Sequence, residues 1–230
     1  MTISAGRNPR VVLVEEASAE VDPDACERLR AARIEADLSL RELGRRVGVS
    51  ASMLSQIENG RAQPSVATLY ALVSCLNVSL DELLGGAPAR RDRPPVPVIG
   101  SADRAILVMD SGVTWERLTA EPDPLVDALL VTYPPGSRSS SGGLMSHSGR
   151  EYGFLLSGRL TVQLGFETFT LEPGSSVSFD SAIPHAYVND YAEAAQGVWH
   201  VVGRNASGTS MTEAAPRQAA APRTSAAGSA

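Results

Sequence analysis

The stretch from Ser39 to Gly60, SLRELGRRVGVSASMLSQIENG, constrains the fold most, because it has the pattern of two short helices joined by a tight turn. Ser39 and Glu42 have the spacing of a capping box at the start of the first helix. Gly48 stands at the turn, where a left-handed backbone costs a glycine little. Ser50 is placed to cap the second helix. Two such helices, the second with a polar outer face, are typical of a helix-turn-helix.

With flanks from about Leu29 to Leu84, this segment resembles the Cro-like phage-repressor family of DNA-binding domains, the XRE family. The residues that carry the resemblance are Ser39-Leu40-Arg41-Glu42-Leu43, Gly48-Val49-Ser50, Ile57-Glu58-Asn59-Gly60-Arg61, Pro64-Ser65, Leu69 and Val78-Ser79-Leu80-Asp81-Glu82-Leu83. The resemblance implies a compact helical domain that binds double-stranded DNA. An αα-hairpin inside an ordinary helical bundle is the alternative interpretation of the same pattern.

The resemblance also implies which side chains meet DNA. Those that would enter the major groove lie on the outward, N-terminal side of the second helix: Ala51, Ser52, Ser55 and Gln56. Gln56 can pair with adenine N6 and N7, and Ala51 can touch a thymine methyl group. The residues expected to contact phosphates, together with the amino ends of the helices, are Arg41, Ser50, Asn59 and Arg61.

Helix signals on both sides of this pair predict a five-helix, all-α domain over residues 22–86. Asp22-Pro23 is a helix start, and the first helix runs to about Ala36 with Leu29, Ala32 and Ala36 as its packing stripe. The apolar side chains that mark the fourth helix at helical spacing are Leu69, Leu72, Val73 and Leu76.

Three segments lack the pattern of a packed core. Residues 1–21 show no clear periodicity, and we expect a disordered N-terminal arm. Residues 87–104 are rich in Pro, Arg and Asp, which predicts an extended linker. Residues 204–230 are rich in Ala, Ser and Pro, and we expect a disordered tail.

Residues 105–203 have a hydrophobic period near two, and short turn-forming clusters interrupt it. The predicted strands are Ile106–Met109, Val113–Leu118, Ala128–Tyr133, Glu151–Leu156, Leu160–Leu164, Thr168–Leu171, Ser176–Phe179, Ala186–Val188 and Gly197–Val202. Many short strands favour a closed barrel or jelly roll. We therefore predict a multidomain α + β protein, all-α at its N-terminal side and all-β at its C-terminal side.

All three histidines lie in the β half. The residues that form a pattern there are, in order, His147, Glu151, Gly153, Ser157-Gly158, Pro173-Gly174, Ile183-Pro184-His185 and Asn189. These fragments resemble the two motifs of the cupin family, small β-barrels of jelly-roll type. The resemblance implies that His147, Glu151 and His185 face one another inside the barrel.

Two imidazoles and one carboxylate suit Zn, Fe, Mn or Ni as a divalent ion. Met145 stands where many metal-binding cupins have a further histidine, and it is a poor ligand for a hard ion. His200 could compensate if it faces inward. The triad could equally line a metal-free effector pocket or be structural. Aromatic residues near enough to wall the cavity, as far as strand alternation allows, are Tyr152, Phe154, Phe179 and Tyr187.

The net charge of −6 gives no overall attraction to DNA, so binding must depend on local arginines. All 20 basic side chains are arginine, which excludes a lysine Schiff base and a lysine general base. No apolar run approaches the length of a membrane span, and the first residues do not have the pattern of a secretory signal. We expect a cytoplasmic protein that binds no membrane, with Cys26 and Cys75 as buried thiols.

A repressor-like domain followed by a cupin is a known arrangement among bacterial transcriptional regulators, in which the cupin is a sensor. The resemblance implies a DNA-binding regulator whose partners are an operator and a small-molecule effector. One recognition helix reads few base pairs, so we expect a homodimer joined through the cupin domain. The alternative is a metal oxygenase or isomerase fused to a DNA-binding domain. Only the His-Glu-His triad supports it, so we expect no enzyme and assign no catalytic residue.

Overall fold

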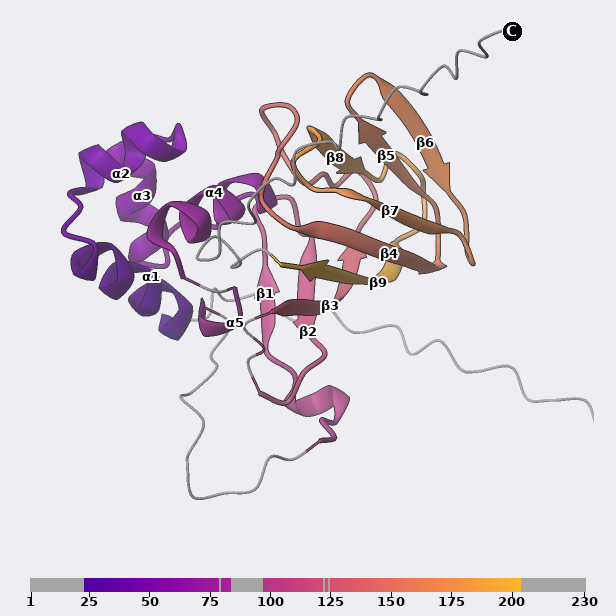
Figure 1. Cartoon of the computed structure of the whole chain (residues 1–230), viewed down its shortest axis with the longest axis horizontal. Coiled ribbons are helices and arrows are strands. Elements are labelled where there is room, and N and C mark those ends of the chain that lie inside the picture. Colours follow the sequence, from indigo (N-terminus) through magenta and orange to yellow (C-terminus); the bar gives the residue numbers. More distant parts are fainter. Residues whose placement is uncertain (1–22, 79, 84–96, 122, 124, 204–230) are drawn as a thin grey trace, which may run out of the picture.

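The computed structural model describes residues 23–78, 80–83, 97–121, 123 and 125–203, which form a helical lobe and a β lobe (Figure 1). The expected disordered arm and tail lie outside the described residues, as does most of the expected linker. The described end of that linker contains a short 3₁₀ turn, Ser101–Asp103.

The helical lobe contains, within the described residues, four helices of 8 to 13 residues and a fifth of a single turn. They are α1 (Pro23–Glu35), α2 (Leu40–Val47), α3 (Ala51–Glu58), α4 (Val66–Leu76) and α5 (Leu80–Leu83). The predicted helical domain is confirmed, and the described part of its fifth helix is the 4 residues Leu80–Leu83. Among the described residues, no helix has the length and apolar character needed to cross a bilayer.

The caps of α2 and α3 form as predicted. Ser39 Oγ accepts a hydrogen bond from the Glu42 amide, and Ser50 Oγ accepts one from the Met53 amide, both at 3.1 Å. Gly48 ends α2 with a φ of 76°, a left-handed backbone that glycine adopts without steric cost. Local hydrogen bonds therefore set the turn between the two helices.

The Glu42 carboxylate does not complete the predicted capping box. It accepts hydrogen bonds from Arg45 at 2.7 Å and from Arg46 at 2.9 Å, one turn further along α2. These i, i+3 and i, i+4 partners lie on the same helix face as the carboxylate.

Arg33 joins α1 to the end of α3. Its guanidinium donates to both carboxylate oxygens of Glu58, at 2.6 and 2.9 Å, which is the bidentate geometry of a strong ion pair. The packing stripe predicted for α1 is partly wrong. Leu29 is buried and Ala32 half-buried, but Ala36 follows the end of the helix and is exposed.

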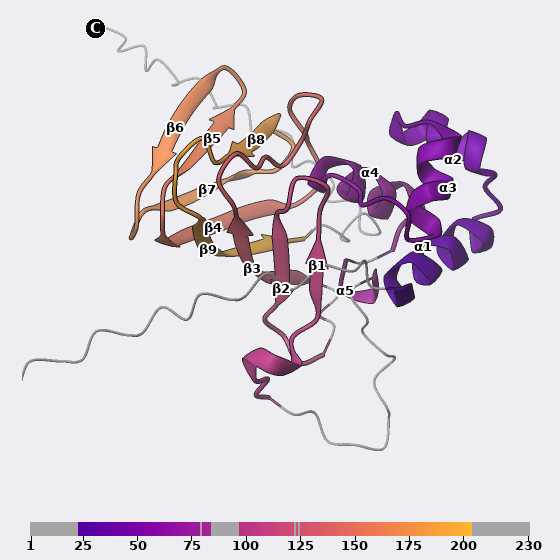
Figure 2. The same cartoon turned by 180° about the vertical axis from the view of Figure 1, so that it is seen from behind.

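The β lobe contains nine strands within the described residues, each where the alternating pattern predicts one (Figure 2). They are β1 (Ile106–Val108), β2 (Thr114–Arg117), β3 (Val126–Tyr133), β4 (Arg150–Ser157), β5 (Leu160–Leu164), β6 (Glu167–Leu171), β7 (Ser176–Asp180), β8 (His185–Val188) and β9 (Ala195–Val202). Six of them form one sheet in the order β1-β2-β3-β9-β4-β7, and three form a second in the order β6-β5-β8. All the pairs are antiparallel, as a jelly roll requires.

Helix α4 lies between helices α2 and α3 and the barrel in both views (Figures 1 and 2). The Ala67 amide donates to the Ser139 carbonyl at 3.0 Å, and the Asp110 amide donates to the Pro64 carbonyl at 3.1 Å. Buried side chains of the two lobes form one continuous hydrophobic cluster. The lobes therefore share a packed boundary at the start of α4.

Candidate functional site

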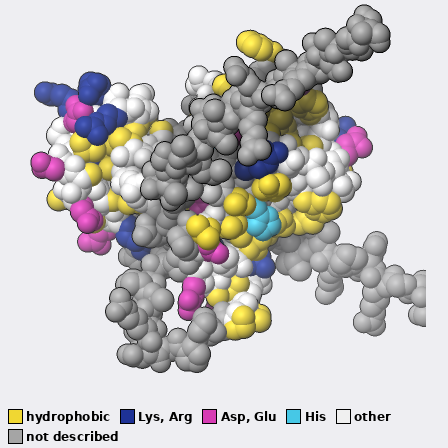
Figure 3. Space-filling view, viewed as in Figure 1, with side chains coloured by type: hydrophobic (Ala, Val, Ile, Leu, Met, Phe, Trp, Pro, Cys, Tyr) yellow, Lys and Arg dark blue, Asp and Glu magenta, His cyan; other side chains and the backbone are white. Residues whose placement is uncertain are grey.

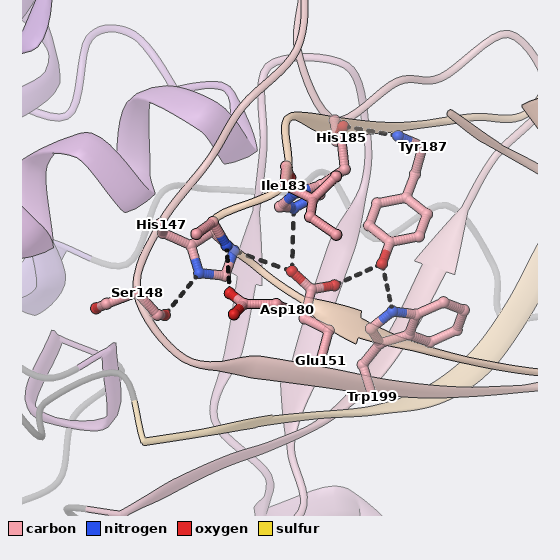
Figure 4. A network of polar contacts seen from close by, with 10 residues as sticks. His147, Ser148, Glu151, Asp180, Ile183, His185, Tyr187 and Trp199 are labelled. Atoms are coloured by element: carbon pink, nitrogen blue, oxygen red, sulfur yellow. Dashed lines mark hydrogen bonds and ion pairs between the residues drawn. The ribbon is translucent and has the colours of Figure 1, made fainter. Parts of the chain in front are cut away.

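The barrel brings His147, Glu151 and His185 together, as the motif order predicts (Figure 4). His147 lies just before β4, Glu151 lies on β4, and His185 begins β8 in the other sheet. The Nε2 atoms of His147 and His185 lie 2.9 and 3.0 Å from the same carboxylate oxygen, Glu151 Oε1. All three side chains are buried.

The imidazole rings of His147 and His185 both turn their Nε2 atoms toward the Glu151 carboxylate. The Nδ1 atom of His147 lies 3.1 Å from the Ser148 carbonyl oxygen, and that of His185 lies 2.8 Å from the Ile183 carbonyl oxygen. Because a carbonyl oxygen only accepts, both Nδ1 atoms carry the hydrogen, and the neutral form of each ring has its lone pair on Nε2. In that form two lone pairs and a carboxylate oxygen converge at one point. This set of donors fits a divalent cation.

The second oxygen of Glu151 is held in place by the barrel. The Tyr187 hydroxyl donates to Glu151 Oε2, and the Trp199 indole donates to the Tyr187 oxygen at 3.1 Å. Burial by itself would raise the pKa of the Glu151 carboxyl, but when the rings of His147 and His185 are protonated, their hydrogen bonds and charge outweigh burial and lower that pKa to about 2. The hydrogen bond from Tyr187 orients the Glu151 carboxylate in the barrel.

Gly153 makes room for this chain of hydrogen bonds. It faces Trp199 across the β4–β9 pair, and a Cβ at position 153 would lie only 2.6 Å from the indole ring. The absent side chain lets the indole lie flat against β4 and reach Tyr187.

A cavity of about 20 Å³ lies beside Glu151. The residues that line it are Val66, Tyr70, Trp115, Leu129, Val131, Tyr133, Met145, Glu151, Tyr187, Trp199 and Val201. Met145 is in the wall, and its backbone exchanges two hydrogen bonds of 2.8 Å with His185. The volume is enough for one water molecule or an ion.

Of the four aromatic residues predicted near the cavity, Tyr187 lines it. Phe179 is buried beside His185, with ring centroids 4.9 Å apart, but does not line the cavity. Tyr152 and Phe154 lie on the outer face of β4 and are 46% and 44% exposed, so their assignment to the cavity is wrong. Because Glu151 faces inward, alternation turns its neighbour Tyr152 outward.

His200 does not complete the triad. It lies on β9 directly opposite Tyr152, on the same outer face of the sheet, while Trp199 and Val201 face inward. The possibility that His200 replaces a further histidine is therefore wrong.

Sequence reasoning missed the cavity walls on β2, β3 and β9, and it missed Tyr70. The Tyr70 ring stacks on His147 with centroids 4.0 Å apart and planes inclined by 15°. It also packs against Trp115 at 5.3 Å. A signal was present, since α4 carries apolar residues around most of its circumference, which indicates burial on two sides.

The four predicted base-reading side chains lie along α3 and are accessible. Ser52 and Gln56 are exposed, and Ala51 and Ser55 are half-buried, whereas Leu54 and Ile57 are buried on the opposite side. Their accessibility fits the predicted role, and contact with bases remains a prediction.

The predicted phosphate contacts Arg41, Ser50, Asn59 and Arg61 are all exposed. Asn59 has a structural task as well, because its Nδ2 donates to the Ser55 carbonyl at 2.6 Å and so caps α3. Arg45 and Arg46, which sequence reasoning did not assign, add exposed positive charge on α2 beside Glu42. Dark blue side chains gather at that edge of the helical lobe (Figure 3).

Comparisons with known proteins match the two lobes separately. A family model described as helix-turn-helix matches residues 29–83, and one described as a cupin domain matches residues 129–209. The HTH-type transcriptional regulator PuuR of Escherichia coli (strain K12) is 28% identical over 166 residues, which cover 72% of this chain and 87% of PuuR. The regulator SutR of the same organism is 26% identical over 158 residues, covering 66% of this chain and 79% of SutR.

A solved structure has the same arrangement of elements. The crystal structure of an HTH_3 family transcriptional regulator from Vibrio cholerae has a TM-score of 0.57 at 23% identity. The match covers 78% of this chain and 96% of that chain, so it spans both lobes.

Proposed function

We propose that this chain, in which an XRE-type helix-turn-helix domain precedes a cupin domain, is a transcriptional regulator whose barrel binds a metal ion or a small effector. The observation that carries the sensing role is the convergence of buried His147 Nε2, His185 Nε2 and Glu151 Oε1, which lie within 4.8 Å of one another. A bound cation would be held by these three atoms and would supply a Lewis acid. The exposed outer face of α3 supports the DNA-binding role.

The proposal is tested by measuring operator binding with Zn²⁺ in the barrel site and after Zn²⁺ has been removed. A labelled fragment of the gene's own upstream region is titrated with the protein, with Zn²⁺ present or after chelation, and fluorescence anisotropy gives the affinity. We expect saturable, sequence-dependent binding whose affinity changes with Zn²⁺. Equal binding to an unrelated fragment of the same length would contradict the regulator, and an identical affinity in both metal states would contradict the metal form of the sensor.

The proposed regulator acts as a homodimer joined through the barrel. The outer face of the six-stranded sheet supports this, because hydrophobic side chains gather over β4 and β9 (Figure 3). Tyr152, Phe154 and Leu156 on β4 are 44% to 48% exposed, beside His200 on β9. Two recognition helices would then read a pseudo-palindrome with half-sites about one helical turn apart.

A charge placed in this apolar face tests the dimer. We expect the wild type to sediment as a dimer and Phe154→Asp as a monomer. Phe166→Asp is the matched control, since Phe166 is fully exposed at the turn between β5 and β6, away from this face. If Phe154→Asp and Phe166→Asp both stay dimeric, the interface lies elsewhere.

A metalloenzyme fused to a DNA-binding domain is the second candidate, and the triad alone favours it. The regulators PuuR and SutR support the first candidate instead. Metal-loaded protein incubated with small amino acids, polyamines or catechols separates the two when oxygen uptake is followed. Turnover with any of them would favour the enzyme.

A further inference from the structure

Helix α4 is buried on two sides. Leu69, Leu72 and Val73 are almost wholly buried, and the helix packs against α2 in the helical lobe. Val66 and Tyr70, one turn apart, line the barrel cavity instead. One helix therefore belongs both to the core of the DNA-binding domain and to the wall of the candidate effector site.

The Tyr70 ring covers the triad directly. It is stacked on His147 at 4.0 Å and packs against Trp115 at 5.3 Å with the planes inclined by 59°, so it contacts an imidazole and an indole at once. The start of α4 is held to the barrel by the hydrogen bonds from Ala67 to Ser139 and from Asp110 to Pro64. The Ala67 amide lies in the first turn of the helix, where it has no partner within the helix.

The remaining cavity is too small for an organic molecule. Its volume of about 20 Å³ holds a water molecule or an ion, whereas small-molecule sites measure about 300–1,000 Å³. The walls on β2, β3 and β9 cannot retreat easily, because each of these strands is paired on both sides. The wall formed by α4 is a helix, so no pairing between strands has to break when it moves.

We propose that Tyr70 is the gate of the effector site. Any ligand enters by displacing the Tyr70 ring: a metal ion needs only a brief displacement, whereas a larger ligand keeps the ring displaced and so separates α4 from the barrel. The ligand that best replaces the ring has a flat or apolar body to lie between His147 and Trp115, and one polar group to meet the triad. This proposal rests on the proposed function, because it takes the barrel to be the effector site.

The gate links the cavity to DNA binding because it controls the orientation of α3 relative to the barrel. The outer face of α3 is exposed while α4 is docked, so docking does not cover the DNA-binding surface. It fixes the angle between α3 and the barrel, and in a barrel-linked dimer that angle sets the spacing of the two recognition helices. Opening the gate removes this constraint and lowers operator affinity.

Both tryptophans of the chain, Trp115 and Trp199, lie in the cavity wall, so intrinsic fluorescence reports on the gate. Acrylamide is the access probe, and the full chain is used throughout. We expect weak quenching in the wild type, several-fold stronger quenching in Tyr70→Ala, and wild-type quenching in Tyr70→Phe, which keeps the ring. Phe166→Ala is the control, because Phe166 is fully exposed at the turn between β5 and β6, and it should quench like the wild type.

Co²⁺ is the probe for entry, followed by tryptophan quenching in a stopped-flow instrument. We expect Co²⁺ to enter Tyr70→Ala about tenfold faster than the wild type, because entry no longer waits for a sparsely populated open form. Phe166→Ala should match the wild type. Operator affinity, measured on the gene's own upstream region, should fall about tenfold in Tyr70→Ala alone.

If Tyr70→Ala loses helix content by circular dichroism, Tyr70→Leu replaces it, since leucine fills the core but cannot stack. Wild-type acrylamide quenching in a folded Tyr70 variant overturns the gate, and so do equal Co²⁺ entry rates. Stronger quenching in Tyr70→Ala with no Co²⁺ binding in any variant supports the gate and contradicts the metal form of the proposed function. The two failures are therefore distinguishable.

Discussion

The candidate residues on the outer face of α3 and those inside the barrel differ in their exposure and in whether they come from one segment of the chain or several. On α3, Ser52 and Gln56 come from one short helix and are exposed to solvent. In the barrel, His147, Glu151 and His185 come from separate segments and are buried. A side chain on α3 can therefore change without disturbing the fold, whereas each group of the candidate site in the barrel is also part of its packed interior. Variants in the two regions should differ in whether stability and binding change together.

The largest effect is expected from His185→Ala. Losing one of three ligands should weaken Zn²⁺ binding by more than about 100-fold, since even the loss of an outer hydrogen-bond partner costs about 10–100-fold. Calorimetric or competitive Zn²⁺ titration measures this. His200→Ala is the matched control, because His200 lies on the outer face of the sheet. The comparison fails if the two variants bind Zn²⁺ equally well.

Gly153→Ala should lower both stability and Zn²⁺ affinity. The new Cβ would lie 2.6 Å from the Trp199 ring and 2.9 Å from Val177, in a region of paired strands. We expect a loss of about 1–3 kcal/mol of unfolding free energy, measured by denaturant titration. Gly142→Ala, which meets no atom within 4 Å, should stay within about 0.5 kcal/mol of the wild type. If Gly153→Ala is as stable as Gly142→Ala, the barrel tolerates substitutions without loss of stability, as is expected for the exposed face of α3.

Gln56→Ala should alter binding without altering stability. Losing a bidentate contact with adenine should cost about 1–3 kcal/mol at one base pair of the operator. Affinities for single-base operator variants identify that position, and the thermal midpoint should not move. An equal loss of affinity for every sequence would mean that Gln56 does not read a base.

Arg61→Ala should give the smallest effect. As a phosphate contact it should weaken all DNA sequences alike and lower the slope of log affinity against log salt by about 1. Binding measured at several salt concentrations gives this slope. A loss confined to one base pair would assign Arg61 to base reading instead.

The features that the sequence predicts correctly are those that depend on residues close together in the chain. The caps at Ser39 and Ser50 and the left-handed Gly48 depend on neighbours a few residues away, and they form as expected. The strands follow from alternation, and the triad follows from the order of the cupin motifs.

Long-range packing limits the rest. The outward direction of His200 depends on the β4–β9 register, which no short stretch determines. Tyr70 is harder still, because an apolar residue on α4 has the same pattern whether it faces the helical core or the barrel. Only the docking of the two lobes distinguishes these positions.

The packing of α4 on both lobes also has a consequence for how such proteins recombine. A DNA-binding domain taken from another regulator would bring its own version of this helix, without side chains matched to the rings of His147 and Trp115. A working chimera would need Val66, Ala67 and Tyr70 to travel with the barrel, while the rest of α4 travels with the helices. The boundary between the two exchangeable domains therefore runs along helix α4 and not through the segment that links them.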